Sequence, residues 1–256
     1  MVKSSTKQDW ESYWGSKDRA EEVYSNEYRI ARNLEIAGIR AGASVLEVGA
    51  GTGRDSIPLA DAGAIVYQLD YSFESLRLIR QRISNYANIH PVGGDTFCLP
   101  FYDNTFDVVF HQGLLEHFRK PEAGRMLDEQ VRVLKPGGLL LVDVPQRYHP
   151  YTVMKHILIA IGKWFAGWER SFSFPELNKL LRAHGLQPVH RYGEWMVPGL
   201  CYRVLREIGK SIGVRLPLYP PGIPVIKTIR QVIRFKLLNT RLPLYTGISI
   251  GIVAKK

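Results

Sequence analysis

Three glycines on alternate positions form the part of this 256-residue sequence best suited to holding a ligand. Gly49, Gly51 and Gly53 follow a short apolar run that ends at Val48, and a segment that reads as a helix, 55–62, comes next. Glycine has no Cβ, so the chain can turn tightly there and let a ligand lie against bare backbone. The first N–H groups of the helix would point into the same space. A strand, a glycine turn and a helix start together favour a site for a nucleotide-type cofactor.

The spacing of these glycines separates one kind of cofactor loop from two others. A dinucleotide fingerprint, G-x-G-x-x-G, would need its third glycine where this chain has Arg54. A phosphate-binding P-loop requires a lysine after its last glycine, and none follows here. The segment E-V-G-A-G-T-G, residues 47–53, instead resembles motif I of the class I S-adenosylmethionine-dependent methyltransferases. The resemblance implies that S-adenosyl-L-methionine is the cofactor and that it is bound by Glu47, Gly49, Ala50, Gly51 and Gly53.

An acidic residue follows at the distance at which related sheets hold a ribose. The run from Ile65 reads as a second strand and ends at Asp70, 21 residues after Gly49. An acid about 20 residues beyond such a loop can reach ribose hydroxyls, and a carboxylate can accept two hydrogen bonds from a diol. Tyr71 offers a ring on which adenine could stack. The alternative is that Asp70 caps the helix that starts near Ser72, a role that Ser72 itself suits better.

Further segments match the same family in the expected order. In the family, an acid at the position of Asp95, beside Thr96, meets the adenine amino group; an ordinary turn is the alternative. Residues 106–118 resemble motif IV and its continuation, with a strand that ends at His111 and a helix over 114–118. Helix end, glycine turn and apolar strand over 133–143 match the segment after motif IV. The resemblance places Asp95, Thr96 and His111 at the cofactor site.

Two histidines are the candidate catalytic residues. Methyl transfer depends largely on alignment of nucleophile and methyl group, but a hydroxyl or protonated amine must also lose a proton to a base. His117, next to Glu116, is the first candidate because histidine titrates near neutral pH. His111 is the second, since it lies nearer the expected cofactor site. The alternative for His117 is a packing or hydrogen-bonding role.

The residues around motif IV also indicate what kind of acceptor to expect. Enzymes of this family that act on exocyclic amines of nucleic-acid bases carry a Pro-Pro-aromatic run there, whereas this chain reads His-Gln-Gly-Leu from His111. No Pro-Cys pair marks a cytosine-C5 enzyme, and no acidic triplet suggests a metal-assisted catechol enzyme. The sequence therefore favours a small-molecule or lipid methyl acceptor, with no metal.

Alternating strand and helix patterns must position these residues. From 44 to 143 they predict a doubly wound, mostly parallel seven-stranded Rossmann-like α/β sheet, whose ligands bind at the carboxyl ends of the strands. The resemblance covers about 43–189. We expect one domain over 1–256, divided as follows: an N-terminal helical lid over 1–42, a cofactor-binding core over 43–193 with lid helices near 149–172, a basic helical insertion over 194–245, and the last strand over 246–256.

Charge is distributed unevenly along the chain. Residues 1–150 carry 17 Lys and Arg against 20 Asp and Glu, whereas residues 151–256 carry 17 against 4. In the insertion, Ile226, Ile229, Ile233 and Leu237 form one helical stripe beside a basic stripe of Lys227, Arg230 and Arg234. Basic amphipathic helices can lie on a membrane or dock on acidic partners. We therefore expect the insertion to associate with an anionic membrane surface, to cover a hydrophobic substrate, or to do both.

Cysteine content and the apolar segments indicate which cellular compartment to expect. Two distant cysteines, Cys98 and Cys201, give neither a disulfide framework nor a metal spacing. The first residues lack a signal-peptide core. The longest apolar stretch, 151–168, is interrupted by charge and is too short to span a bilayer, so it predicts a lid helix or one lying on a membrane surface. A cytoplasmic protein, peripherally attached to a membrane, is the resulting expectation.

Two other functions remain as alternatives. An RNA methyltransferase could grip phosphates with its basic half, and its binding would weaken steeply with salt. Against this, the basic segment is interleaved with Ile, Val and Leu more than with aromatic residues. A non-catalytic cofactor-binding protein of the same fold is the second alternative, and the intact glycines and Asp70 argue against it.

Overall fold

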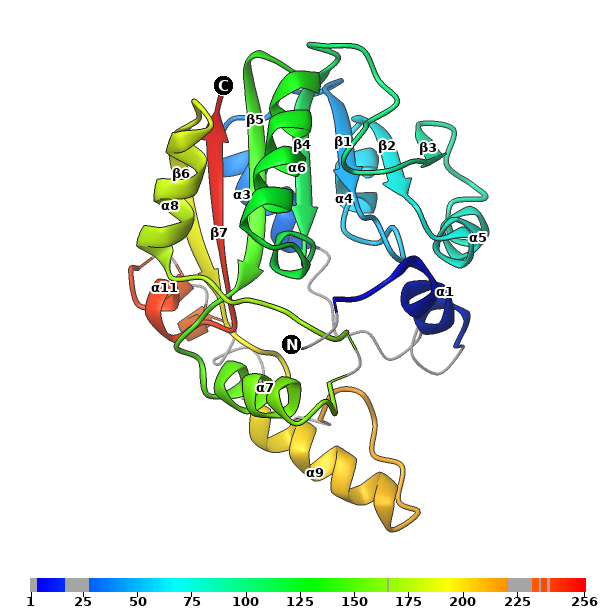
Figure 1. Ribbon diagram of the computed structural model, residues 1–256, viewed down its shortest axis with the longest axis vertical. Helices are drawn as coiled ribbons and strands as arrows, with labels where there is room; N and C mark the ends of the chain where they lie inside the picture. Colours follow the sequence, from blue (N-terminus) through cyan, green and yellow to red (C-terminus); the bar gives the residue numbers. More distant parts are fainter. Residues whose placement is uncertain (1–3, 17–27, 165, 221–231, 235, 239) are drawn as a thin grey trace.

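A seven-stranded sheet forms the centre of the computed structural model (Figure 1). The structure describes residues 4–16, 28–164, 166–220, 232–234, 236–238 and 240–256. In spatial order the strands are β3 (Ile89–Gly93), β2 (Ile65–Asp70), β1 (Ser44–Val48), β4 (Phe106–Gln112), β5 (Leu134–Pro145), β7 (Ser249–Lys255) and β6 (Gln187–Glu194). Strands β1 to β5 pair in parallel, and β7 runs antiparallel to both of its neighbours. The predicted doubly wound, mostly parallel sheet is confirmed.

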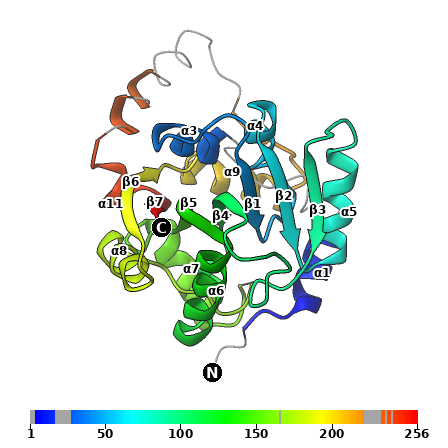
Figure 2. The ribbon, with the colours of Figure 1, turned by 90° about the horizontal axis from the view of Figure 1, so that it is seen from above.

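Helices cover both faces of this sheet (Figures 1 and 2). One face carries α6 (Lys120–Val133) and α8 (Phe174–Ala183), and the other carries α3 (Tyr28–Ile36), α4 (Ile57–Asp61) and α5 (Phe73–Arg82). The remaining helices are α1 (Lys7–Gly15), α7 (Pro150–Ala160), α9 (Leu200–Ser211) and α11 (Pro243–Thr246). Because both faces are covered, central strands can be apolar at nearly every position. In β1, Val45, Leu46 and Val48 are fully buried.

The carboxyl ends of the parallel strands point toward α1 and α7 (Figure 1). Strand ends of a doubly wound sheet form its ligand crevice where the strand order reverses. Here the order reverses between β1 and β4, which are neighbours although β2 and β3 lie between them in sequence. The fold therefore brings the glycine loop after β1 beside the end of β4.

An insertion separates β6 from β7, as the sequence predicts. The two strands are paired over their length, yet residues 195–248 lie between them and include α9 and α11. Ile226, Ile229, Lys227 and Arg230 of the predicted stripes lie outside the described residues. Among the helices that the structure does describe, none combines the length and the apolar content required for a membrane crossing.

The structure corrects one residue of the predicted basic stripe. Arg234 does not extend into solvent: its guanidinium pairs with the carboxylate of Glu194 and donates to the carbonyl of Trp195, 3.2 Å away. Glu194 is buried, and it also accepts from Arg32 at 3.1 Å. A buried carboxylate needs cationic partners, and this requirement draws Arg234 inward.

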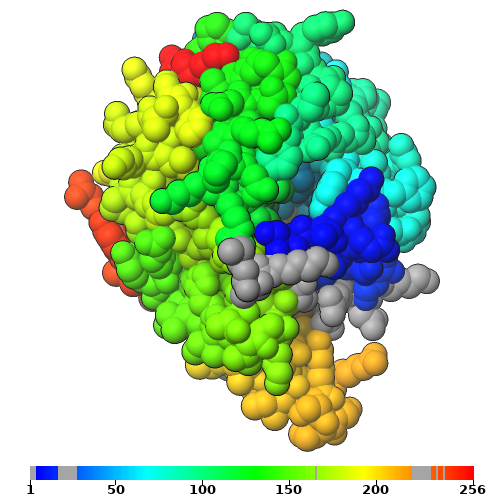
Figure 3. All heavy atoms as spheres, viewed as in Figure 1, coloured from blue at the N-terminus to red at the C-terminus, as the bar shows by residue number. Residues whose placement is uncertain are grey.

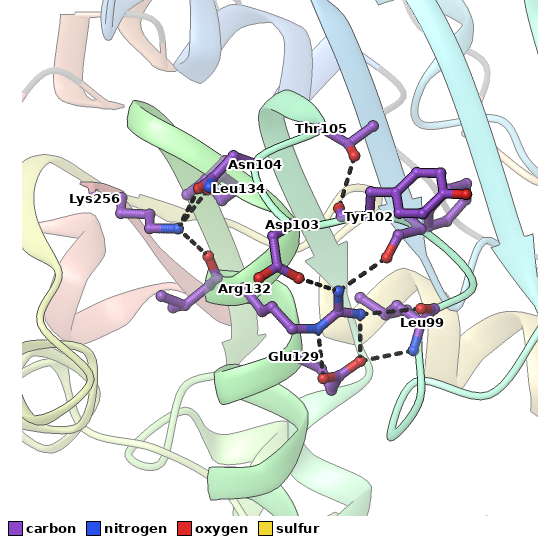
Figure 4. A network of polar contacts seen from close by, with 11 residues as sticks. Leu99, Tyr102, Asp103, Asn104, Thr105, Glu129, Arg132, Leu134 and Lys256 are labelled. Atoms are coloured by element: carbon purple, nitrogen blue, oxygen red, sulfur yellow. Dashed lines mark hydrogen bonds and ion pairs between the residues drawn. The ribbon is translucent and has the colours of Figure 1, made fainter.

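A polar network fastens the segment that leads into β4 to α6 (Figure 4). Arg132 donates to the carbonyls of Leu99 and Phe101 at 3.1 and 2.9 Å, and pairs with Asp103 and Glu129 at 2.8 Å each. The hydrogen bond from Arg132 lowers the pKa of Glu129. One side chain thus supplies donors to four groups on two elements.

Arg132→Ala is therefore expected to lower the free energy of unfolding by about 1.5–3 kcal/mol, the range for hydrogen bonds that involve a charged group. Urea unfolding followed by circular dichroism measures the change. The matched control is the exposed Arg80 of α5, whose replacement by alanine should shift stability by less than about 0.5 kcal/mol. Equal losses in the two variants would contradict the role given to this network.

Candidate active site

The glycine loop has the backbone geometry that only glycine adopts easily. Gly49, Gly51 and Gly53 all have positive φ angles, +70°, +55° and +66°. The N–H groups of Gly49 and Ala50 donate to the carbonyl of Leu69 at 2.8 and 3.0 Å, which ties the loop to the end of β2. Alternate glycines are required here because each of these positions turns the chain in the left-handed region.

Helix α1 covers this loop. A Cβ added to Gly51 would lie 2.7 Å from the indole of Trp14, so the bare backbone of Gly51 faces that ring. Glu11 of the same helix accepts hydrogen bonds from Phe73 N and Glu74 N at 2.8 and 3.0 Å, at the start of α5. Figure 3 shows α1, in blue, packed against the cyan residues of the β2–α5 region. The aromatic N-terminal segment therefore lies over the predicted cofactor loop.

Asp70 lies at the centre of the loop's hydrogen bonds. Its carboxylate accepts from Gly51 N at 2.8 Å and from Ser72 N at 2.9 Å. The side chain of Ser72, rather than that of Asp70, caps α5 by accepting from Ser75 N. Burial raises the pKa of Asp70, and the two backbone hydrogen bonds oppose that rise. Contact of this carboxylate with ribose hydroxyls stays a prediction for Asp70.

Glu47 lies beneath the loop. Its carboxylate accepts from the Ser56 hydroxyl at 2.6 Å and from Gln68 Nε2 at 3.4 Å, and Gln68 also donates to the carbonyl of Gly53 at 2.6 Å. Burial, and then the neighbouring Asp55, raise the pKa of Glu47 well above its usual range. These contacts make Glu47 a support of the loop; direct contact with a cofactor stays a prediction for this residue.

The residues predicted to meet adenine lie at the ends of β2 and β3. The ring of Tyr71 is 39% exposed, and Lys7 Nζ lies 6.0 Å from its centre. Asp95 is exposed and accepts from Phe97 N at 2.9 Å, while Thr96 Oγ1 is buried and has no hydrogen-bond partner among the described residues. The fold thus brings Tyr71, Asp95 and Thr96 to one edge beside Asp70.

The surroundings of the two candidate histidines differ from the expectation. His111 is fully buried in β4, neither ring nitrogen has a partner among the described residues, and burial lowers its pKa to about 3. This environment argues against His111 as a base, because the imidazole stays neutral. His117 packs edge-on against Trp10 with ring centres 5.0 Å apart, and its Nδ1 lies 3.9 Å from Glu169. Burial lowers the pKa of His117 more than Glu169 raises it.

The predicted helix over 114–118 is shorter than expected. Only a single 3-10 turn forms, Leu115–His117, because Phe118 and Arg119 are extended before α6 begins. In such a turn successive side chains point about 120° apart, since three residues complete one turn. Adjacent residues therefore face different surroundings: His117 points toward Trp10, while Glu116 faces a cavity.

This cavity, of about 470 Å³, lies at the ends of β4, β5 and β7 under α7. Gly49 lies beside it, because a Cβ added there would lie 3.0 Å from Leu114, the residue after Gly113 of the cavity wall. Its charged lining residues are Arg29, Glu116, Asp143, Lys155, Glu169, Glu194, Arg203 and Arg234, and its aromatic ones are Tyr151, Trp164, Trp195 and Tyr219. The cavity therefore lies close to the glycine loop, with Leu114 next to both.

Most charges on this wall are paired. Lys155 lies 2.6 Å from Glu169, and both side chains are almost fully buried. Trp164 Nε1 donates to the other oxygen of Glu169 at 2.6 Å. Arg29 lies 3.5 Å from Asp143, which also accepts from Tyr192 Oη at 2.8 Å. Within the described residues, Glu116 is the carboxylate of this cavity that has no cationic partner within 4.0 Å.

Four buried polar atoms of the cavity wall have no hydrogen-bond partner in the described part of the chain. They are Oε2 of Glu116, Oε1 of Gln112, Nε of Arg29 and Oγ1 of Thr152. Leaving such an atom unpaired costs about 1–3 kcal/mol. Four such atoms belong to residues that line this one cavity, so a polar ligand group bound there could supply the missing partners.

Glu116 has the titration behaviour expected of an acid or base. Burial, and then the negative charge of Glu169, raise its pKa to about 8.

The sequence pointed to His117, one residue away, and missed Glu116 because spacing alone does not show which of two adjacent side chains faces the ligand. Arg29, Lys155 and Glu169 lie outside the family motifs found in the sequence, so nothing marked them as site residues. Among the described residues, no group of three or more His, Cys, Asp or Glu side chains is arranged to hold a metal ion.

Fold and site together define an α/β enzyme of the methyltransferase type, and comparison with known proteins agrees. Residues 45–138 match a family model described as a methyltransferase domain. The chain is 40% identical over 109 residues to a demethylmenaquinone methyltransferase of Renibacterium salmoninarum, covering 43% of this chain and 44% of that one. It is 32% identical over 181 residues to the Bacillus licheniformis protein of the same name, covering 62% and 76%.

Solved structures show the same fold. The phosphoethanolamine N-methyltransferase 2 of Haemonchus contortus, in complex with S-adenosyl-L-methionine, has a TM-score of 0.65 at 16% identity, covering 98% of this chain and 60% of that one. The 1,6-didemethyltoxoflavin-N1-methyltransferase of Burkholderia thailandensis, with bound S-adenosylhomocysteine, has a TM-score of 0.60 at 19% identity, covering 98% and 86%.

The chain belongs to the class I S-adenosylmethionine-dependent methyltransferases. S-adenosyl-L-methionine is the cofactor of this family. The match with the Renibacterium salmoninarum relative spans less than half the length of that protein.

Proposed function

We propose that this protein transfers a methyl group from S-adenosyl-L-methionine to a small-molecule or lipid acceptor bound in the cavity under α7. The observation that carries the proposal is the set of four unpaired polar atoms on a cavity wall next to the glycine loop. Reaction at a methyl group needs the nucleophile held in line and close. A cavity that adjoins the cofactor loop and lacks hydrogen-bond partners is suited to hold it.

The residues around the loop fit the cofactor. Gly51 has no side chain and is covered by the Trp14 ring, the Asp70 carboxylate lies beside the loop where it can meet ribose hydroxyls, and the exposed ring of Tyr71 can stack on adenine. Thr96 Oγ1 lacks a partner. When bound, the cofactor supplies an activated methyl group on a sulfonium ion.

Glu116 is the residue that we assign to proton transfer. A group whose pKa is about 8 can both hold and release a proton near neutral pH. Its Oε2 atom faces the cavity without a partner, so an acceptor hydroxyl or amine can donate to it. Arg29 and Thr152 would orient the acceptor, and α7 would keep bulk water out.

The cavity lining supports an acceptor with an apolar body and a polar reactive end. Tyr151, Trp164, Trp195 and Met196 supply apolar surface, whereas the unpaired polar atoms belong to Arg29, Gln112, Glu116 and Thr152. We therefore propose a quinol-like or lipid-like acceptor, in keeping with the name of the demethylmenaquinone methyltransferases. Work at the surface of an anionic membrane is part of this proposal.

Calorimetric titration with S-adenosyl-L-methionine and, separately, with NADH tests the first step. We expect saturable heat with the sulfonium compound and none with NADH. The loaded protein is then incubated with reduced naphthoquinones and phospholipids, and mass spectrometry is used to find a product heavier by one methylene group. Binding of NADH alone, or no methylated product from either class, would overturn the proposal.

A further inference from the structure

Helix α7 exposes several of its apolar residues and buries its charged side chain, Lys155. Val153, Ile157 and Ile161 recur every four residues and therefore share one face; they are 55–58% exposed. The opposite face carries Thr152 and Lys155, which are buried at the cavity. A helix that only covered a cavity in water would present the reverse pattern, with polar residues facing solvent.

Helix α9 repeats this arrangement. Val204 and Ile208 are 44% and 55% exposed, and Ile212, just after the helix, is 72% exposed. The inner side instead holds Arg206, whose Nε donates to the carbonyl of Leu216 at 3.1 Å. Both helices thus expose aliphatic side chains, and each buries one cation, Lys155 in α7 and Arg206 in α9.

The two helices lie at one end of the molecule and meet at the cavity. Figure 1 places both beyond the carboxyl ends of the parallel strands, and Figure 3 shows α9, in yellow and orange, projecting past α7. Tyr151 at the start of α7 and Arg203 of α9 line the same cavity. We call the six residues Val153, Ile157, Ile161, Val204, Ile208 and Ile212 the α7–α9 surface. The two helices that carry it also line, through Tyr151 and Arg203, the cavity in which the acceptor is proposed to bind.

The charged residues near this surface are mostly basic, which suits contact with an anionic lipid layer. Exposed basic residues flank the apolar ones: Lys163 after α7, Lys210 within α9 and Arg215 after it. The acid in these two segments, Glu207, lies 3.3 Å from Lys210. Residues 151–256 carry 17 Lys and Arg against 4 Asp and Glu, so two copies of this half would repel each other. Apolar residues flanked by lysine and arginine favour the interface of an anionic bilayer instead.

We propose that the α7–α9 surface docks on an anionic phospholipid bilayer, so that the acceptor enters the cavity from the membrane rather than from water. This inference deepens the proposed function by assigning its membrane contact to named residues. Entry of the acceptor from the membrane rests on the proposed function, whereas binding to vesicles is tested without an acceptor. The outward aliphatic residues would enter the headgroup region, and the flanking cations would meet lipid phosphates. The cavity beside them would then face the bilayer.

Flotation with vesicles tests this docking. The full chain is mixed with vesicles of phosphatidylcholine containing phosphatidylglycerol, or of phosphatidylcholine alone. We expect binding to the anionic vesicles, and at least a roughly tenfold loss of vesicle affinity for the double variant Ile157→Asp/Ile208→Asp. The matched control is Ile36→Asp on α3, since Ile36 is 57% exposed and lies outside the surface. That variant should bind vesicles as the unaltered protein does.

Further outcomes separate this inference from its alternatives. Failure of the unaltered protein to bind anionic vesicles, or equal binding by the double variant, would overturn the docking. So would a dimer in the absence of lipid that the double variant converts to a monomer, because the surface would then be a contact between copies. Calorimetry with S-adenosyl-L-methionine should give the same affinity in the double variant. If the unaltered protein failed to bind that compound but still bound vesicles, the proposed function would fall and the docking would remain.

Discussion

Replacement of Gly51 by valine is expected to abolish binding of S-adenosyl-L-methionine while the sheet stays folded. Gly51 has a φ of +55°, which costs a residue with a Cβ about 1–2 kcal/mol. The added Cβ would lie 2.7 Å from the Trp14 ring, and the two further methyl groups of valine need still more room. The hydrogen bond from Gly51 N to Asp70 would be strained as well. Calorimetry should show no saturable heat.

Gly63 provides the matched control for this substitution. Its φ is +90°, but a Cβ added there meets no heavy atom within 4 Å, so Gly63→Val imposes the backbone strain without the clash. We expect Gly63→Val to lose stability and to keep its affinity for S-adenosyl-L-methionine. Circular dichroism of both variants shows whether the sheet survives. Unchanged cofactor affinity in a folded Gly51→Val protein would remove the loop from the cofactor site.

The second large effect is expected for Glu116→Gln. Glutamine keeps the size of the side chain but cannot take a proton, so kcat should fall by about 10²- to 10⁴-fold, the usual contribution of general acid–base catalysis. The affinity for S-adenosyl-L-methionine should not change. His117→Asn is the natural comparison, because His117 is adjacent but faces Trp10. A large loss of kcat in His117→Asn together with a small one in Glu116→Gln would reverse the assignment.

The pH dependence of stability checks the same residue without an acceptor. The pKa of Glu116 is about 8 in the folded protein, above its ordinary 4.5, so the folded state holds a proton that the unfolded chain releases. The resulting stabilisation is complete below about pH 4.5 and is lost as pH rises through about 8. The unaltered protein should therefore lose stability over this range more steeply than Glu116→Gln does. Parallel curves from urea unfolding at several pH values would contradict the raised pKa.

Local sequence patterns predicted the glycine loop and the sheet that carries it. Gly49, Gly51 and Gly53 must be glycines because of their own φ angles, and Asp70 closes the loop from the end of the next strand. The strand pattern predicted the sheet for the same reason, since the residues of each strand lie next to one another in sequence. Features that depend on residues close together in the sequence, such as a turn or a strand, can therefore be predicted from the sequence alone.

The residues of the cavity under α7 could not be predicted from local patterns in this way. Lys155 meets Glu169 only after α7 folds back, and Arg29 meets Asp143 across more than 100 positions of the chain. Arg234 was assigned to an exposed stripe by its spacing, but the buried Glu194 draws it inward. The choice between Glu116 and His117 depended on which way one short turn faces. Each of these is decided by packing between distant segments, which periodicity does not record.

Helix α1 must move each time the cofactor is exchanged. Trp14 lies on Gly51, and Glu11 holds the start of α5 through hydrogen bonds of 2.8 and 3.0 Å, so the loop is bare only when α1 lifts and these contacts break together. Spent cofactor must leave, and fresh cofactor must enter, during such openings. Weakening the contacts of α1 would therefore speed cofactor exchange and lower the affinity for each cofactor molecule.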